Sequence, residues 1–79
     1  MEDYKDQYDH LIKFIFEMYI KCVKNDYKFN GGKTSSNTFL LFSILNVANF
    51  PIDDLKKIDG LLEKQYGGKV YDRDWFGKN

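Results

Sequence analysis

The sequence predicts a mainly α domain: three helices followed by a short extended C-terminal segment. Two segments of the 79-residue chain, near residues 4–23 and 51–66, repeat apolar residues at helical spacing. A third, almost continuously apolar segment lies between them. An α+β variant with a two-stranded β element stays open. The length and the lack of a linker predict a single domain, residues 1–79.

The first predicted helix runs from Tyr4 to Val23. Its apolar positions follow the i, i+3, i+4, i+7 pattern, and its opposite face is charged. Four further residues widen the apolar arc beyond ~100°: Phe14, Phe16, Ile20 and Val23. We therefore expect other elements to cover this helix on two sides, or part of it to meet a partner. The apolar positions are Tyr4, Tyr8, Leu11, Ile12, Ile15, Met18, Tyr19 and Cys22.

The second predicted helix spans residues 39–48, after a polar turn that contains Gly31 and Gly32. Ser36, Asn37 or Thr38 is expected to cap it, because short polar side chains favour this position. Since residues 39–48 are apolar nearly all round, we expect the most buried helix of the domain here. A buried strand is the alternative, because periodicity does not separate the two over so short a run.

The third predicted helix begins near Pro51 and ends at Gly67-Gly68. Proline suits a first turn, and Asp53 and Asp54 follow where the helix dipole favours carboxylates. After the glycines, residues 70–76 alternate between apolar and charged and are expected to be extended. Residues 27–29 are a candidate short strand to pair with them. The expected apolar stripe of the third helix is Leu55, Ile58, Leu62 and Tyr66.

The composition narrows the function classes. The sequence is 43% hydrophobic and 18% aromatic, so it should fold, and its 12 basic and 12 acidic residues leave no net field to attract nucleic acid. Cys22 is the single cysteine, which excludes an intramolecular disulfide and a thiolate cluster for zinc. The acidic N-terminus does not resemble a secretion signal, and no apolar run approaches the ~20 residues of a membrane span. We therefore expect a cytoplasmic protein.

The residues that carry chemistry in other proteins form no recognisable site here. Gly32-Lys33-Thr34 resembles the end of a phosphate-binding loop, but Tyr27 stands where that motif needs glycine. His10, the single histidine, has no serine or cysteine on its helix face. The acidic pairs Asp53-Asp54 and Asp72-Asp74 lack further ligands at metal-binding spacing. The sequence therefore predicts a non-enzymatic protein without catalytic, cofactor-binding or metal-binding residues.

The C-terminal aromatic residues are the main candidates for contact with a partner. Tryptophan, tyrosine and arginine dominate binding hot spots. For Trp75 and Phe76, packing back onto the small core is the first expectation, and contact with a partner is the alternative. The predicted partner-binding residues are Tyr71, Arg73, Trp75, Phe76 and Phe14.

The resulting functional hypothesis is a small regulatory or inhibitory protein that acts by docking on a larger protein or on a second copy of itself. Inhibitors of host proteins encoded by phages and mobile elements belong to this class. The alternative is a winged-helix-like DNA-binding regulator. In it, residues 49–51 form the turn between two helices and residues 69–76 form a wing. The numbers of acidic and basic residues between residues 51 and 79 are equal. This counts against the DNA-binding alternative, because DNA-binding surfaces normally have an excess of basic residues.

Overall fold

The fold is built on one long helix. The computed structural model describes residues 2–67, with side chains from Tyr4 onward. Helix α1 (Glu2–Phe29) is followed by α2 (Ser36–Val47) and α3 (Ile52–Tyr66). At about 1.5 Å per residue, α1 is roughly 42 Å long and accounts for the 44 Å longest dimension of the molecule. The prediction of three helices is confirmed.

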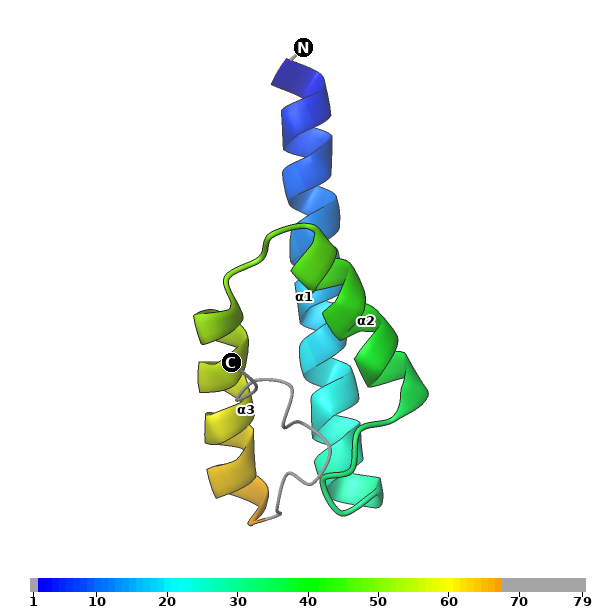
Figure 1. Cartoon of the computed structure of the whole chain (residues 1–79), viewed down its shortest axis with the longest axis vertical. Helices are drawn as coiled ribbons and strands as arrows, with labels where there is room; N and C mark the ends of the chain where they lie inside the picture. The colour runs from blue at the N-terminus through cyan, green and yellow to red at the C-terminus, as the bar shows by residue number, and fades with distance from the viewer. Residues whose placement is uncertain (1, 68–79) are drawn as a thin grey trace.

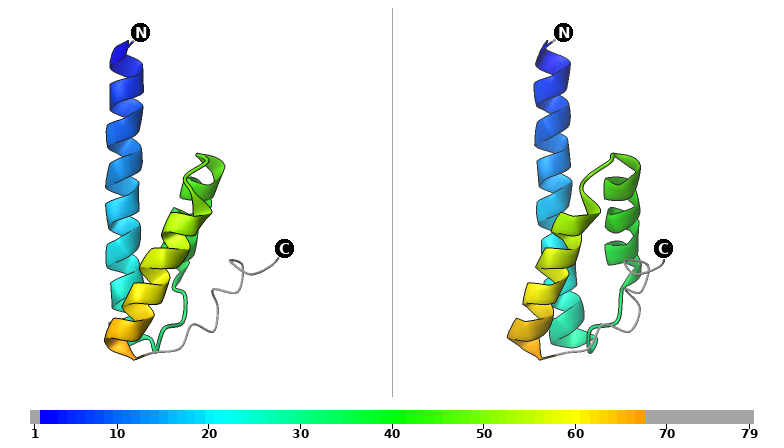
Figure 2. Two further views of the ribbon diagram at one scale, coloured as in Figure 1. Left: turned by 90° about the vertical axis from the view of Figure 1, so that its left-hand side faces the viewer. Right: turned by 60° about the vertical axis from the view of Figure 1, so that its left-hand side comes forward.

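Helices α2 and α3 both pack against α1, and they contact each other much less (Figures 1 and 2). Both helices lie beside the C-terminal part of α1 (Figure 1). Because both are shorter than α1, its N-terminal turns project beyond them. We call the projecting residues 2–11 the arm. None of the helices described combines the length and apolarity needed to cross a membrane.

The end of α1 differs from the prediction. The candidate short strand at residues 27–29 does not form, because α1 continues through Phe29. The helix stops where Gly31 and Gly32 take positive φ angles of 61° and 88°, and the Gly32 N–H donates to the Asp26 carbonyl at 2.9 Å. Residues 2–67 contain no strand, and the predicted extended segment 70–76 lies outside the described residues.

The second helix forms, and the alternative of a strand at residues 39–48 is wrong. Ser35 caps it one residue before the predicted candidates, and its hydroxyl oxygen accepts from the Thr38 N–H at 3.3 Å. The expectation that this helix is the most buried is also wrong. α1 is the central helix, because α2 and α3 cover its wide apolar arc on two sides and leave the outer face of α2 exposed.

The core lies between α1 and the two shorter helices. Tyr19 is fully buried at its centre, where its ring lies 6.4 Å from that of Phe42 on α2 and its hydroxyl donates to Asp59 on α3 at 3.3 Å. Near the end of α3, the rings of Tyr27 and Tyr66 stack 6.3 Å apart. The buried apolar residues are Tyr19, Val23, Tyr27, Phe42, Leu45, Leu55 and Leu62.

The third helix follows the prediction at both ends. Pro51 precedes its first turn, Asp53 and Asp54 lie in that turn, and Gly67 ends the helix with a φ of 69°. Of its predicted apolar stripe, Leu55 and Leu62 are buried, and Ile58 and Tyr66 pack against the core from partly exposed positions.

Candidate docking surface

The outer face of α2 is apolar and carries no charge. None of the 12 residues of this helix is charged. Thr38, Phe42 and Leu45 occupy its inward face, and Leu41 also packs against the core. The exposed apolar residues of the helix are Phe39, Leu40, Ile44 and Val47. Leu40, Ile44 and Val47 follow i, i+4, i+7 spacing along that outer face, and Val47 is 82% exposed. We call these three residues the α2 stripe.

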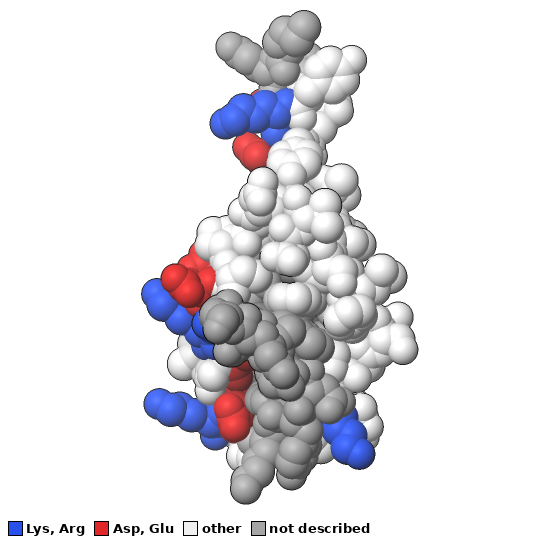
Figure 3. All heavy atoms as spheres, in the orientation of Figure 1, with Lys and Arg blue, Asp and Glu red and all other residues white. Residues whose placement is uncertain are grey.

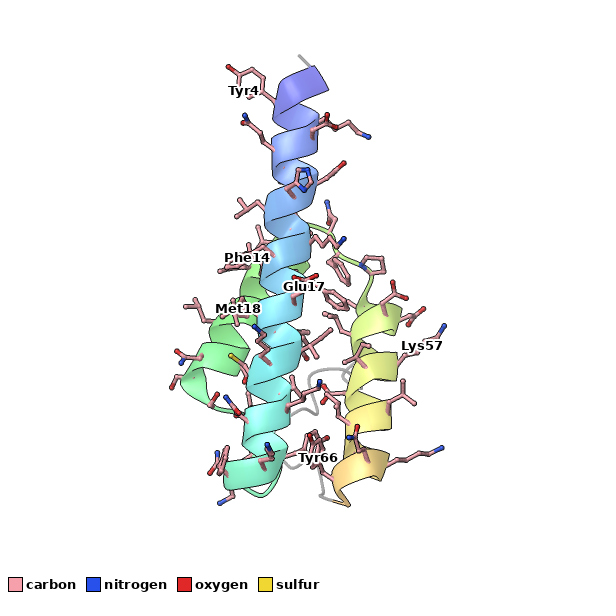
Figure 4. All side chains as sticks on the ribbon, turned by 180° about the vertical axis from the view of Figure 1, so that it is seen from behind. Tyr4, Phe14, Glu17, Met18, Lys57 and Tyr66 are labelled. Atoms are coloured by element: carbon pink, nitrogen blue, oxygen red, sulfur yellow. The ribbon has the colours of Figure 1, made fainter. Side chains whose placement is uncertain are left out.

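The arm carries a second exposed apolar stripe. Tyr4, Tyr8 and Leu11 repeat the i, i+4, i+7 spacing, and each is more than half exposed. We call them the arm stripe. Figure 4 shows Tyr4, Phe14 and Met18 on one side of α1, the side on which α2 lies. Phe14 and Met18 therefore extend the apolar surface from the arm toward α2.

The two stripes adjoin. The Tyr8 hydroxyl donates to the carbonyl of Ala48 at 3.4 Å, which ties the arm to the end of α2 next to Val47. In Figure 3, the surface over α2 and the adjacent edge of the arm is free of charge, and the charged side chains gather mainly over α3 and the other edge of the arm. The arm stripe, the α2 stripe and Phe14 thus form one uncharged surface, which we call the docking surface.

A groove of about 310 Å³ lies beside this surface, where α1 leaves the two shorter helices. Its apolar lining includes Ile12 and the rings of Phe16 and Phe50, which stack with centroids 4.7 Å apart. Asp9 and Lys13 also line it. The volume is at the lower end of the range for small-molecule pockets, and the groove fits one or two apolar side chains of a partner.

Buried Asp26 fixes the position of α2. Its Oδ2 accepts from the Thr38 hydroxyl at 2.7 Å and from the Ser35 N–H at 3.2 Å, and both donors belong to the first turn of α2 or its cap. Because both hydrogen bonds join α1 to the start of α2, they orient the α2 stripe outward. This carboxylate therefore has a structural role in the fold.

The remaining reactive side chains do not assemble into a catalytic site in the described part of the chain. Cys22 is half-buried, and burial, followed by the nearby charge of Asp26, raises the pKa of its thiol, which disfavours the nucleophilic thiolate. His10, Asp53 and Asp54 are exposed. No group of three potential metal ligands occurs among the described residues.

The structure describes one of the five predicted partner-binding residues. Phe14 is 58% exposed on the docking surface, and Tyr71, Arg73, Trp75 and Phe76 lie outside the described residues.

The sequence prediction missed the exposed residues of the two stripes. It assigned the arm stripe to the apolar face of the first helix and treated residues 39–48 as buried all round. The absence of any charge from Ser36 to Val47 was the available signal, because a solvent-exposed helix normally has a polar face. Comparisons with protein families, curated proteins and solved structures give no match to this chain.

Proposed function

We propose that this protein is a non-enzymatic regulatory or inhibitory protein that acts by docking, through the docking surface, on a protein partner, either a larger protein or a second copy of this chain. The observation that carries the proposal is the uncharged outer face of α2, which exposes Leu40, Ile44 and Val47 next to the arm stripe. Apolar patches larger than a few hundred Å² are uncommon on soluble monomers and mark interaction sites. Inhibitors of host proteins that phages and mobile elements encode act in this way, and we include such an inhibitor in the proposal.

The physical driving force for docking is burial of apolar area. Removal of apolar surface from water contributes roughly 25 cal/mol per Å² before the costs of association. Tyr4, Tyr8 and Phe14 supply three rings, each more than half exposed, and aromatic side chains are frequent binding hot spots. The surface therefore offers both the area and the residue types of an interface core.

The chemistry of the surface also specifies the partner's contact region. A charged group placed against the α2 stripe would lose its hydration without an opposite charge to compensate. The partner must therefore present apolar side chains of matching shape, with its polar groups at the rim.

The test is a pull-down with the tagged 79-residue chain from lysate of its source cells, with and without nuclease. We expect capture of a stoichiometric protein that survives nuclease. The double variant Leu40→Glu/Val47→Glu should lose this protein, because it places two carboxylates on the α2 stripe. The matched control is Leu61→Glu, because Leu61 is 62% exposed on α3, away from the docking surface.

Equal capture by the double variant and the wild-type protein would contradict the proposal. Circular dichroism of each variant establishes that the helices persist. Recovery of nucleic acid alone would instead support the DNA-binding alternative. The α3 residues available for that function include Lys56, Lys57 and Lys64, which share the helix with exposed Asp53 and Asp54.

A further inference from the structure

We infer that the occupant of the docking surface is a second copy of this chain, with the arm of each copy lying along the α2 stripe of the other. The inference rests on the proposed function, because both require this surface to bind protein. It goes further in naming the partner and the pairing of the helices.

The arm stripe and the α2 stripe match in spacing. Both stripes have the same i, i+4, i+7 order, with Tyr4, Tyr8 and Leu11 on the arm and Leu40, Ile44 and Val47 on α2. In each case, the first and last residues lie about 10.5 Å apart along the helix axis, at 1.5 Å per residue. Two helices with stripes of equal length and spacing can pack these side chains against each other along the whole stripe.

The directions of α1 and α2 are compatible with this pairing. Helix α2 runs antiparallel to α1, since Thr38 at its start contacts Asp26 near the end of α1, and Ala48 just beyond its end contacts Tyr8. In a two-fold dimer, the two α1 helices can cross close to Phe14 and run in opposite directions. Since α2 is antiparallel to α1 of its own chain, each arm then runs parallel to α2 of the other copy. The order along the two stripes then agrees: Tyr4 lies beside Leu40 of the other copy, Tyr8 beside Ile44, and Leu11 beside Val47.

The absence of charge also favours pairing of the docking surface with itself. A two-fold interface is self-complementary, so a charge close to the axis would face the same charge on the other copy. The six residues of the two stripes and Phe14 are all uncharged. These seven residues therefore bring no like charges together when the surface pairs with itself, and the charged Asp9 and Lys13 line the groove beside it.

The exposed apolar area of the docking surface is large enough for a stable dimer interface. The exposed apolar residues of the surface, together with Phe39 on α2, number eight. Taken at on the order of 100 Å² each, about half of what an aromatic side chain buries, they offer roughly 800 Å² per copy. This is the area that each partner buries in a standard stable interface, about 800 Å².

The arm itself also requires cover. Packing of an amphipathic face supplies most of the stability of a helix in a protein, and the arm projects beyond both shorter helices (Figure 1). The Tyr8 hydrogen bond to Ala48 is its link to α2. Exchange of arms between two copies gives each arm an apolar helix to pack against.

The first experiment is sedimentation equilibrium of the 79-residue chain over a concentration series. We expect the mass to rise from that of the 9.4 kDa chain to twice this value. Leu11→Glu and Leu40→Glu, which alter different stripes, should each weaken self-association at least about 100-fold. Leu61→Glu, the control on α3, should leave it unchanged.

The second experiment tests the pairing of arm and α2. Chains with Tyr4→Cys and chains with Leu40→Cys, both in a Cys22→Ser background, are mixed and oxidised. We expect a disulfide-linked heterodimer in high yield, because the inferred pairing places these two positions side by side. The control mixture replaces Leu40→Cys by Leu61→Cys and should give little of this product.

A monomer at all concentrations, or equal cross-linking in the two mixtures, would overturn the inference. The proposed function is judged separately by the pull-down. Loss of a captured larger protein in Leu40→Glu/Val47→Glu, with a monomeric wild-type protein, would overturn the second copy as the occupant and leave docking in place. Absence of both self-association and capture would overturn both proposals.

Discussion

At the residue scale, the hydrogen bond between Asp26 and Thr38 holds the start of α2 against α1 and so fixes which face of α2 points outward. Replacement of Thr38 by valine keeps the shape of the side chain and removes the hydroxyl that donates to Asp26 at 2.7 Å. A buried acceptor that loses a donor destabilises a fold by about 1–3 kcal/mol. We expect Thr38→Val to lower the free energy of unfolding by this amount in urea denaturation.

The control for this prediction is Ser43→Ala in the same helix. The Ser43 hydroxyl donates to the Phe39 carbonyl one turn earlier, a local bond that spans no helix interface. Its loss should change stability by less than about 0.5 kcal/mol. Equal effects of the two substitutions would show that the contact with Asp26 does not anchor α2.

At the element scale, Gly60 is a weak point within α3. It lies in the helix interior, and a Cβ added there would meet no heavy atom within 4 Å. Glycine in a helix interior costs about 1 kcal/mol relative to alanine. Gly60→Ala should therefore raise the free energy of unfolding by up to about 1 kcal/mol, as measured by thermal or urea denaturation.

Gly67 provides the opposite case at the end of the same helix. Its φ of 69° is in the left-handed region, which costs a residue with a Cβ roughly 1 kcal/mol or more. Gly67→Ala should therefore destabilise the protein, although open space surrounds the added Cβ there as well. Stabilisation by both substitutions would contradict this account of the end of α3.

The ends of α3 were predictable from single residues, because Pro51 and Gly67 have conformational preferences that depend little on the rest of the fold. The face of α2 that points outward was not predictable. Apolar residues surround this helix, so periodicity does not distinguish Leu45, which is fully buried, from Val47, which is largely exposed. Only the position of α1 selects the inward face.

The candidate site was predictable only in part, for a related reason. Phe14 was identified because the apolar arc of α1 is too wide for one-sided packing. Tyr4 and Tyr8 belong to the same periodic pattern as buried Tyr19, so the pattern alone assigns them to the core. Helix lengths separate them: at 1.5 Å per residue, α2 and α3 span about 18 and 22 Å and leave the start of α1 uncovered.

At the scale of the whole molecule, the absence of net charge and of charge on the docking surface predicts how binding responds to salt. Screening weakens interactions between charges and leaves apolar burial nearly unaffected. We expect self-association, and capture of any protein partner, to change less than about threefold between roughly 50 and 500 mM NaCl. The measurement is sedimentation equilibrium or a binding titration at each salt concentration.

A steep loss of binding with salt would contradict the uncharged surface as the binding site. Proteins that bind DNA through several phosphate contacts lose about 10³–10⁵ in affinity over a fourfold rise in salt. The same titration therefore separates the docking function from the DNA-binding alternative.

The position of Tyr19 has a mechanical consequence for any partner that binds the outer face of α2. Helices α2 and α3 barely touch, but Tyr19 contacts both, through the ring of Phe42 and the carboxylate of Asp59. A force applied to α2 therefore reaches α3 through a side chain of α1. This residue couples the two shorter helices, and a displacement of Phe42 would be transmitted to the hydrogen bond at Asp59 on the far side of the core.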